Sequence, residues 1–198
     1  MELSILQHAK DKAPRQVTLD EVVRQIRGDQ WPAGYQPLVV VGAVVQGGLQ
    51  KKNVRWLTGL CVTHIHGDSQ QVRDDPHTKL CFSDQNGGMY VVYEYELNDG
   101  YGKEQQMRYY SRVQHFGMEY YARLTGCEAD HILVGVTKPV PLCHDPNMYY
   151  NAESMAFHAD DISGKPPEKQ NGGHDKYAKP SEIKAWLDAR VKLRRNVV

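Results

Sequence analysis

A proline-free stretch, residues 103–125, is the feature that most limits how this chain can fold. Apolar and small side chains recur along it every three or four positions, which predicts one amphipathic helix. Gly126 is typical of the residue that follows a helix end. A shorter helix is predicted after Thr18, because Thr18 and Glu21 have the spacing of a capping box. The apolar stripe of this second helix consists of Leu19, Val22, Val23 and Ile26.

Short apolar runs surround these helices. Strands are predicted at Leu3–His8, Leu38–Gln46, Leu57–His66, Leu80–Ser83, Met89–Leu97 and Ile132–Val136. The turn residues Asn86-Gly87-Gly88 separate two of these strands and indicate a hairpin. Together the pattern predicts an α+β fold, in which helices pack on one face of a mostly antiparallel sheet. The nearest simple template is the layout of the RNA-recognition motif.

The charge balance excludes one class of function. The chain has 24 Lys and Arg residues and 24 Asp and Glu residues, so its formal net charge at pH 7 is zero. A strongly basic nucleic-acid binder of the histone type needs a large positive excess and is therefore excluded. A local basic groove is compatible with the balance, and Lys51, Lys52 and Arg55 form a small basic cluster.

Other patterns bear on location and domain organisation. The first residues lack a signal-peptide pattern, the apolar run Leu38–Val45 is too short to cross a bilayer, and the four cysteines form no CxxC pair. We therefore expect a cytoplasmic protein with reduced cysteines and no membrane association. Prolines and paired glycines indicate a linker at 159–180, between a domain at 1–158 and an amphipathic helix at 181–198.

Two histidines at the end of a predicted strand, His64 and His66, form the sharpest local signal. Residues i and i+2 of a strand point to the same face, so both imidazoles can bind one metal ion. Asp68, His131 and His144 are candidates to complete such a site. The alternative interpretation is a pair of solvent-facing histidines on a strand end.

Two further patterns could carry phosphate chemistry. The glycine-rich turn after Ser83 lets a phosphate approach backbone N–H groups, although an ordinary hairpin turn has the same sequence. On the long helix, Tyr120 or Tyr121 could attack a phosphate that the His-x-His metal polarises, as in single-strand DNA nickases. The alternative for Tyr121 is packing in the core, which its helical spacing supports.

The same patterns, taken in order along residues 1–158, carry a resemblance to a known family. The matching segments are 3–27, Leu38–Gly48, Thr58–His66, Ser83–Tyr90, Asp130–Lys138, His144–Pro146 and Tyr149–Ala152 with Phe157. Together they resemble the primase-like N-terminal domain of virulence-associated E (VirE-type) proteins of mobile elements, a branch of the archaeo-eukaryotic primase superfamily. The resemblance implies a primase-like fold and a role in DNA replication, with single-stranded DNA or a nucleotide as ligand.

The resemblance also implies roles for individual residues. His64 and His66 stand where the family has its Asp-x-Asp metal ligands, and Asp130 is the family's metal-binding, catalytic acid that this chain retains. The implied nucleotide contacts are Ser83, Asn86, Gly87, Gly88, Tyr90 and Lys138. Because Mg²⁺ prefers oxygen ligands, the replacement of two acids by histidine predicts that ordinary polymerase activity is lost.

Three functions remain open from the sequence. The first is a nucleic-acid- or nucleotide-binding domain without ordinary polymerase activity, whose basic groove includes Lys51, Lys52 and Arg55. The second is a metal-dependent phosphoryl-transfer enzyme of the nickase type, with Mn²⁺, Zn²⁺ or Mg²⁺ held by His64, His66 and either Asp130 or His144. The third is a non-catalytic scaffold that binds a protein partner, for which a helicase-like chain is the expected candidate.

Overall fold

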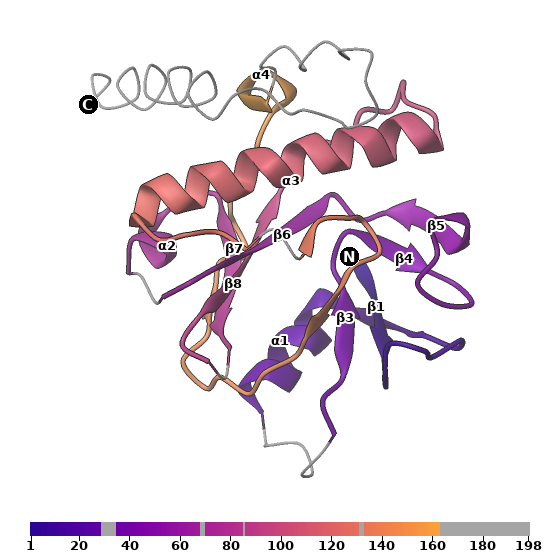
Figure 1. Ribbon diagram of the computed structural model, residues 1–198, viewed down its shortest axis with the longest axis horizontal. Coiled ribbons are helices and arrows are strands. Elements are labelled where there is room, and N and C mark those ends of the chain that lie inside the picture. The colour runs from indigo at the N-terminus through magenta and orange to yellow at the C-terminus, as the bar shows by residue number, and fades with distance from the viewer. Residues whose placement is uncertain (29–34, 68–69, 85, 131–132, 163–198) are drawn as a thin grey trace. The chain divides into compact units, whose positions relative to one another are not determined.

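The computed structural model describes residues 1–28, 35–67, 70–84, 86–130 and 133–162 (Figure 1). The chain divides into two compact units, Met1–His158 and Ala159–Val198. In the second unit the described residues form one short helix, α4 (Ala159–Ile162). The helix that we predict at 181–198, and most of the linker before it, lie outside the described residues.

Strands dominate the first unit, and all their pairings in the described residues are antiparallel. One four-stranded sheet has the order β2 (Arg15–Thr18), β1 (Glu2–Leu6), β3 (Leu38–Val40), β9 (Pro139–Pro141). A second has the order β10 (Tyr149–Tyr150), β7 (Thr78–Ser83), β8 (Met89–Glu94), β6 (Leu60–Ile65). A two-stranded sheet joins β4 (Ala43–Val45) to β5 (Val54–Leu57), with a 3₁₀ turn η1 (Lys51–Asn53) between them. The α+β prediction is confirmed, but the expectation of a single sheet is wrong.

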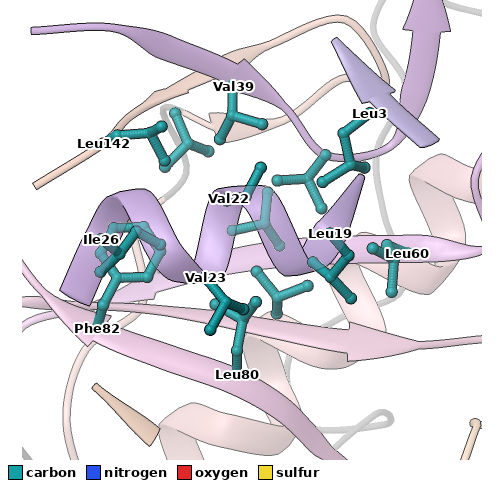
Figure 2. Packing of buried hydrophobic residues seen from close by; sticks show 14 of the residues in the cluster. Leu3, Leu19, Val22, Val23, Ile26, Val39, Leu60, Leu80, Phe82 and Leu142 are labelled. Carbon is teal, nitrogen blue, oxygen red and sulfur yellow. The ribbon is translucent and has the colours of Figure 1, made fainter. Parts of the chain in front are cut away.

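Helix α1 (Leu19–Arg27) lies between the two four-stranded sheets (Figure 2). It begins as predicted, because the Thr18 hydroxyl accepts the backbone N–H of Glu21 at 3.2 Å. Its four apolar residues are all buried. Leu3, Val39 and Leu142 pack on one side of the helix, and Leu60, Leu80 and Phe82 pack on the other. This helix therefore supplies the core that holds the two sheets together.

Helix α3 (Lys103–Thr125) covers the opposite face of the second sheet (Figure 1). The approach is close at Gly117, where a Cβ atom would lie 2.0 Å from the hydroxyl oxygen of Tyr93 on β8. That hydroxyl donates to the Val113 carbonyl at 3.3 Å. The helix ends as predicted at Gly126, which has a left-handed φ of 72°. Helices therefore cover both faces of this sheet, and not one face as predicted.

Two predicted strands differ from the structure. Leu38–Gln46 bends at Val41-Gly42, so its first half pairs with β1 and its second half with β5. Residues 133–136 form turns instead of a strand, because the side chain of Gln114 makes hydrogen bonds to backbone groups of this segment. Its amide donates to the Leu133 carbonyl at 2.8 Å and accepts the Gly135 N–H at 2.8 Å. The strand of this region is β9, which follows the turns.

The sequence patterns also missed β2, β5, β10 and the short helix α2 (Gln70–Asp74). Each is five residues or fewer, and the single buried residue of α2 is Val72. Such short elements give no periodicity to detect. No helix in the described ranges has both the length and the apolar character that a membrane crossing requires.

Candidate metal centre

A cleft of about 490 Å³ opens in the first unit, between the two four-stranded sheets. Its lining includes the end of β6, the β7–β8 turn and Tyr90 of β8. Pro139 and Pro141 of β9 and Asp130 also line the cleft. Three motifs that lie far apart in the sequence, the histidine pair, the glycine turn and Asp130, therefore meet at one place.

Backbone hydrogen bonds place Asp130 beside the histidine pair. The His66 N–H donates to the Glu128 carbonyl at 2.9 Å, and the Asp130 N–H donates to the His64 carbonyl at 2.8 Å. Ile65 and Ala129 form an antiparallel bridge between these two bonds. The segment 128–130 thus runs along the end of β6 as a short extra strand.

The side chains of His64, His66 and Asp130 form a cluster with metal-ligand chemistry. One ligand atom from each residue lies within 4.8 Å of the other two. The two imidazole centroids are 5.4 Å apart, so the histidines share a face as predicted. His64 is buried, Asp130 is partly exposed and His66 is exposed. The cluster is thus anchored on one side and open to solvent on the other.

His64 has a different polar neighbour on each ring nitrogen. Its Nε2 lies 2.9 Å from Oδ2 of Asp84, within hydrogen-bond distance. Its Nδ1 lies 3.9 Å from Oδ2 of Asp130 and has no hydrogen-bond partner among the described residues. An ionised carboxylate only accepts hydrogen bonds, so the nitrogen that faces Asp84 carries the proton. In the neutral ring, Nδ1 then turns a lone pair toward the Asp130 carboxylate.

The glycine turn holds Asp84 in place. Oδ1 of Asp84 accepts the N–H groups of Asn86 at 2.7 Å and Gly88 at 2.6 Å. Burial acts to raise the pKa of Asp84, but these two N–H groups and the His64 imidazole together lower it below its ordinary value. Asp84 is therefore ionised at neutral pH. Because these N–H groups are already engaged, they are not free to cradle a phosphate, and that expectation from the sequence has no support here.

The close approach of neighbouring side chains also requires glycine at position 88. A Cβ atom at this position would lie 2.5 Å from Nε2 of His64 and 2.8 Å from Oδ2 of Asp84. Any side chain here would intrude on the hydrogen bond between those two residues. The turn therefore provides both the hydrogen bonds that orient Asp84 and the room for His64 to reach it.

Tyr90 completes the wall of the cleft around the histidines. It is the cross-strand partner of His64, and the two ring centroids are 4.7 Å apart. Burial, followed by the nearby Cys143, Asp84 and Asp130, raises the pKa of Tyr90 to about 12. Tyr90 is therefore a neutral phenol at physiological pH, suited to donating a hydrogen bond to an anionic ligand.

The other sequence candidates for binding lie around the cleft or away from it. Ser83 donates its backbone N–H to Asp145 at 2.8 Å, and Lys138 directly precedes the cleft residue Pro139. His144 is partly buried and is not a member of the metal-ligand cluster. The exposed residues Lys51, Lys52 and Arg55 lie on η1 and β5, away from the lining that the structure describes. Asp68 and His131 fall outside the described residues.

The structure does not bring the two candidate nucleophiles, Tyr120 and Tyr121, to the cleft. Tyr121 is fully buried, its hydroxyl accepts from Thr78 at 3.1 Å, and burial raises its pKa well above the ordinary value. Tyr120 donates to Asp75 at 2.6 Å. Thr78 begins β7, whereas the cleft lies beyond the other end of that strand, ~17 Å away at ~3.3 Å per residue. Core packing accounts for Tyr121.

Sequence reasoning missed a charged residue of the site, Asp84, besides the cleft prolines Pro139 and Pro141. The signal of Asp84 is an aspartate two residues before Asn86, the spacing at which an Asp side chain accepts a backbone N–H in a turn.

Comparison of the chain with family models, with curated proteins and with solved structures gave no match in any of the three. The assignment of function therefore rests on the geometry of the cleft.

Proposed function

We propose that the cleft binds one divalent metal ion through Nδ1 of His64, His66 and Asp130, and that the protein uses this ion on a phosphate-bearing ligand. The observation that carries the proposal is the buried Nδ1 of His64, which faces a carboxylate at 3.9 Å and has no hydrogen-bond partner among the described residues. A buried lone pair without a partner is costly, and so is its approach to a carboxylate. A cation between the two groups satisfies both.

The dimensions and the donor set agree with a metal ion. Ligand atoms at ~2.0–2.2 Å from one ion lie at most about 4.4 Å apart. The three candidate ligand atoms lie within 4.8 Å of one another, so small side-chain rotations would bring them to that spacing. Two imidazole nitrogens and one carboxylate oxygen are typical of catalytic transition-metal sites, which keep a further position for water or substrate. The exposed side of His66 leaves that position open to the cleft.

A metal-free arrangement uses the same atoms. A protonated His64 would donate to Asp84 through Nε2 and attract Asp130 through Nδ1, without any metal. This alternative predicts that added metal leaves the protein unchanged. The metal titration described below separates the two.

A nucleotide or single-stranded nucleic acid is the ligand that we propose. The convergence of His64, the glycine turn and Asp130 is the arrangement that the primase-like resemblance implies. Tyr90 offers a phenol donor inside the cleft, and Lys138 adjoins it. A bound divalent ion supplies Lewis-acid polarisation of a phosphoryl oxygen. We expect no ordinary polymerase activity, because the ligands include two imidazoles in place of acids.

Nickase chemistry with a tyrosine nucleophile has less support. Of the described tyrosines, Tyr90 is the one that lines the cleft, and its raised pKa makes it a weak nucleophile at neutral pH. A scaffold that binds a helicase-like partner through residues 181–198 stays a prediction, since that segment lies outside the described residues.

Metal binding is tested by calorimetric titration of the chelator-treated protein with Zn²⁺, Co²⁺, Mn²⁺ and Mg²⁺. We expect one ion per chain, and loss of binding in His64→Ala, His66→Ala and Asp130→Ala. The matched control is His8→Ala, which removes an exposed histidine outside the cluster. Stoichiometric binding that survives all three substitutions, or no binding at all, would overturn the metal site.

Ligand binding is tested by fluorescence polarisation of a labelled oligothymidylate, at low salt, with and without the metal. We expect binding that the metal strengthens and that salt weakens, because phosphate contacts release counterions. Absence of binding at low salt under both conditions would contradict the nucleic-acid proposal while leaving the metal site intact.

A further inference from the structure

We propose that Asp84 is a positioning residue, which holds His64 as the Nε2–H tautomer and thereby makes Nδ1 the ligand atom of a site that selects Zn²⁺ or Co²⁺ over Mg²⁺. This inference rests on the proposed metal site and adds to it the class of metal and the residue that prepares the site for it. Asp84 itself is not among the three metal-ligand candidates.

The first step of the argument is the rigidity of Asp84. Both of its carboxylate oxygens are engaged, Oδ1 by two backbone N–H groups and Oδ2 by His64. The backbone N–H of Asp84 also donates to the Gly88 carbonyl at 2.8 Å, which closes the turn on itself. The Asp84 side chain is 10% exposed and that of His64 is 8% exposed. The carboxylate is thus fixed by the turn, independently of His64.

The second step is what a fixed carboxylate does to an imidazole. Hydrogen-bond acceptors behind a metal-binding histidine set its tautomer, orient its ring and increase the basicity of the opposite nitrogen. Here the opposite nitrogen is Nδ1, and it points toward Asp130. The pair Asp84–His64 therefore has the form of a carboxylate–histidine–metal arrangement that is prepared before any ion enters.

The third step concerns the choice of metal. Mg²⁺ requires near-ideal octahedral oxygen coordination and keeps several waters, whereas imidazole nitrogens suit Zn²⁺ and its neighbours. The cluster supplies one carboxylate and two imidazoles. Among the described residues that line the cleft, the further carboxylate is Asp84, and its bond to Nε2 of His64 holds it away from the ion. Asp84 thus withholds an oxygen ligand and at the same time strengthens a nitrogen ligand.

The experiment begins with the metal-free wild-type chain. A ¹⁵N–¹H correlation spectrum of the histidine rings, with His64 assigned through His64→Ala, reports which nitrogen carries the proton. We expect the Nε2–H tautomer for His64 near neutral pH. The Nδ1–H tautomer or a doubly protonated ring would overturn the inference, and this measurement requires neither metal binding nor a variant of Asp84.

The second measurement compares cobalt affinity, by visible absorption, in wild type, Asp84→Asn and Asp145→Asn. Asp145 is the matched control, because it also accepts two backbone N–H groups, from Ser83 and Asn147, but makes no hydrogen bond to His64 among the described residues. We expect Asp84→Asn to lose about 10–100-fold in affinity and to mix the His64 tautomers. We expect Asp145→Asn to change neither.

The outcomes separate the two proposals. Equal cobalt affinity in wild type and Asp84→Asn would overturn the positioning role and leave the metal site standing. No cobalt binding by the wild type would overturn the metal site, and the tautomer spectrum would still report on Asp84. Tighter binding of Mg²⁺ than of Zn²⁺ by the wild type would overturn the choice of metal.

Discussion

The backbone N–H of Asp130 donates to the carbonyl of His64 at 2.8 Å, although the two residues lie on opposite sides of the long helix α3 in the sequence. This bond belongs to the segment that runs beside the end of β6, so it is part of the fold and independent of any ligand. The carboxylate and the imidazole therefore face each other before a ligand arrives. A preformed site of this kind can be tested by disturbing its supports one at a time.

Gly88→Ala should damage the site through a steric clash alone. The added Cβ would lie 2.5 Å from Nε2 of His64, so the ring must move. We expect a loss of about 1–3 kcal/mol in the free energy of unfolding and a large loss of metal affinity. Denaturant unfolding and cobalt titration measure the two effects.

Gly87→Ala is the informative comparison for this change. Its φ of 84° strains an alanine, but no atom lies within 4 Å of the new Cβ. We expect it to lower stability while it leaves metal affinity nearly unchanged. Equal losses of affinity in the two variants would contradict the steric explanation for Gly88.

Gln114→Ala should loosen the segment that follows Asp130. Gln114 is 1% exposed, and its amide bonds the Leu133 carbonyl, the Gly135 N–H and, at 3.2 Å, the Val62 carbonyl. Removing it takes a hydrogen-bond partner from one buried and two partly buried backbone groups, at a cost of about 1–3 kcal/mol. Urea unfolding measures this, with the exposed Gln16→Ala on β2 as control. Equal stability of the two variants would exclude a structural role for Gln114.

The β4–β5 hairpin should contribute to nucleic-acid affinity separately from the metal. Residues 30–67 contain no Asp or Glu, and the hairpin exposes Lys51, Lys52, Arg55 and Trp56, the last with 44% of its surface exposed. Removal of one side chain that neutralises a phosphate should reduce the salt slope by ~0.7. Removal of the Trp56 ring from a stacked base should cost about 1–3 kcal/mol of binding.

Fluorescence polarisation at several salt concentrations checks the hairpin prediction in Arg55→Ala and Trp56→Ala. The exposed Lys12→Ala is the control for a loss of charge elsewhere. Metal affinity should be the same in all of these variants. If Arg55→Ala and Lys12→Ala lower the salt slope equally, the hairpin has no special role.

Stability should fall steeply at high pH. Burial raises the pKa of Tyr90 to about 12 and holds those of Tyr93, Tyr110 and Tyr121 well above their ordinary value of 10.0. Between pH 10 and 12 the unfolded chain loses phenol protons that the folded chain keeps, so the free energy of unfolding decreases as pH rises.

The ultraviolet absorbance of tyrosinate, followed together with circular dichroism, tests this pH dependence. We expect the tyrosinate of the buried residues to appear together with unfolding. Tyr90→Phe should make the decrease in stability less steep, because one linked group is removed. Gradual ionisation of the buried tyrosines in a chain that stays folded would contradict the prediction.

Features set by neighbours in the sequence could be predicted, and those set by distant partners could not. The start of α1 follows from Thr18 and Glu21, three residues apart, and the end of α3 from Gly126. By contrast, Leu38–Gln46 divides between two sheets because its halves find different partners, β1 and β5. Residues 133–136 are turns because Gln114, on another element, takes their hydrogen bonds.

The candidate site follows the same rule. His64 and His66 were predictable because a strand places alternate residues on one face. The contribution of Asp84 was not, because it depends on a hydrogen bond to a residue on another strand. The role of Tyr121 could not be decided from the sequence, because a tyrosine at helical spacing suits both a nucleophile and a core residue. Its complete burial in the structure identifies it as a core residue.

The two prolines of β9 have a consequence for any molecule that enters the cleft. Pro139 and Pro141 line the same cleft as the metal cluster, and proline has no backbone N–H to offer. At these two positions the cleft therefore presents carbon rings and no backbone hydrogen-bond donor. We expect this cleft to suit a ligand with a charged end and a flat apolar face, such as a nucleotide whose base packs against the prolines.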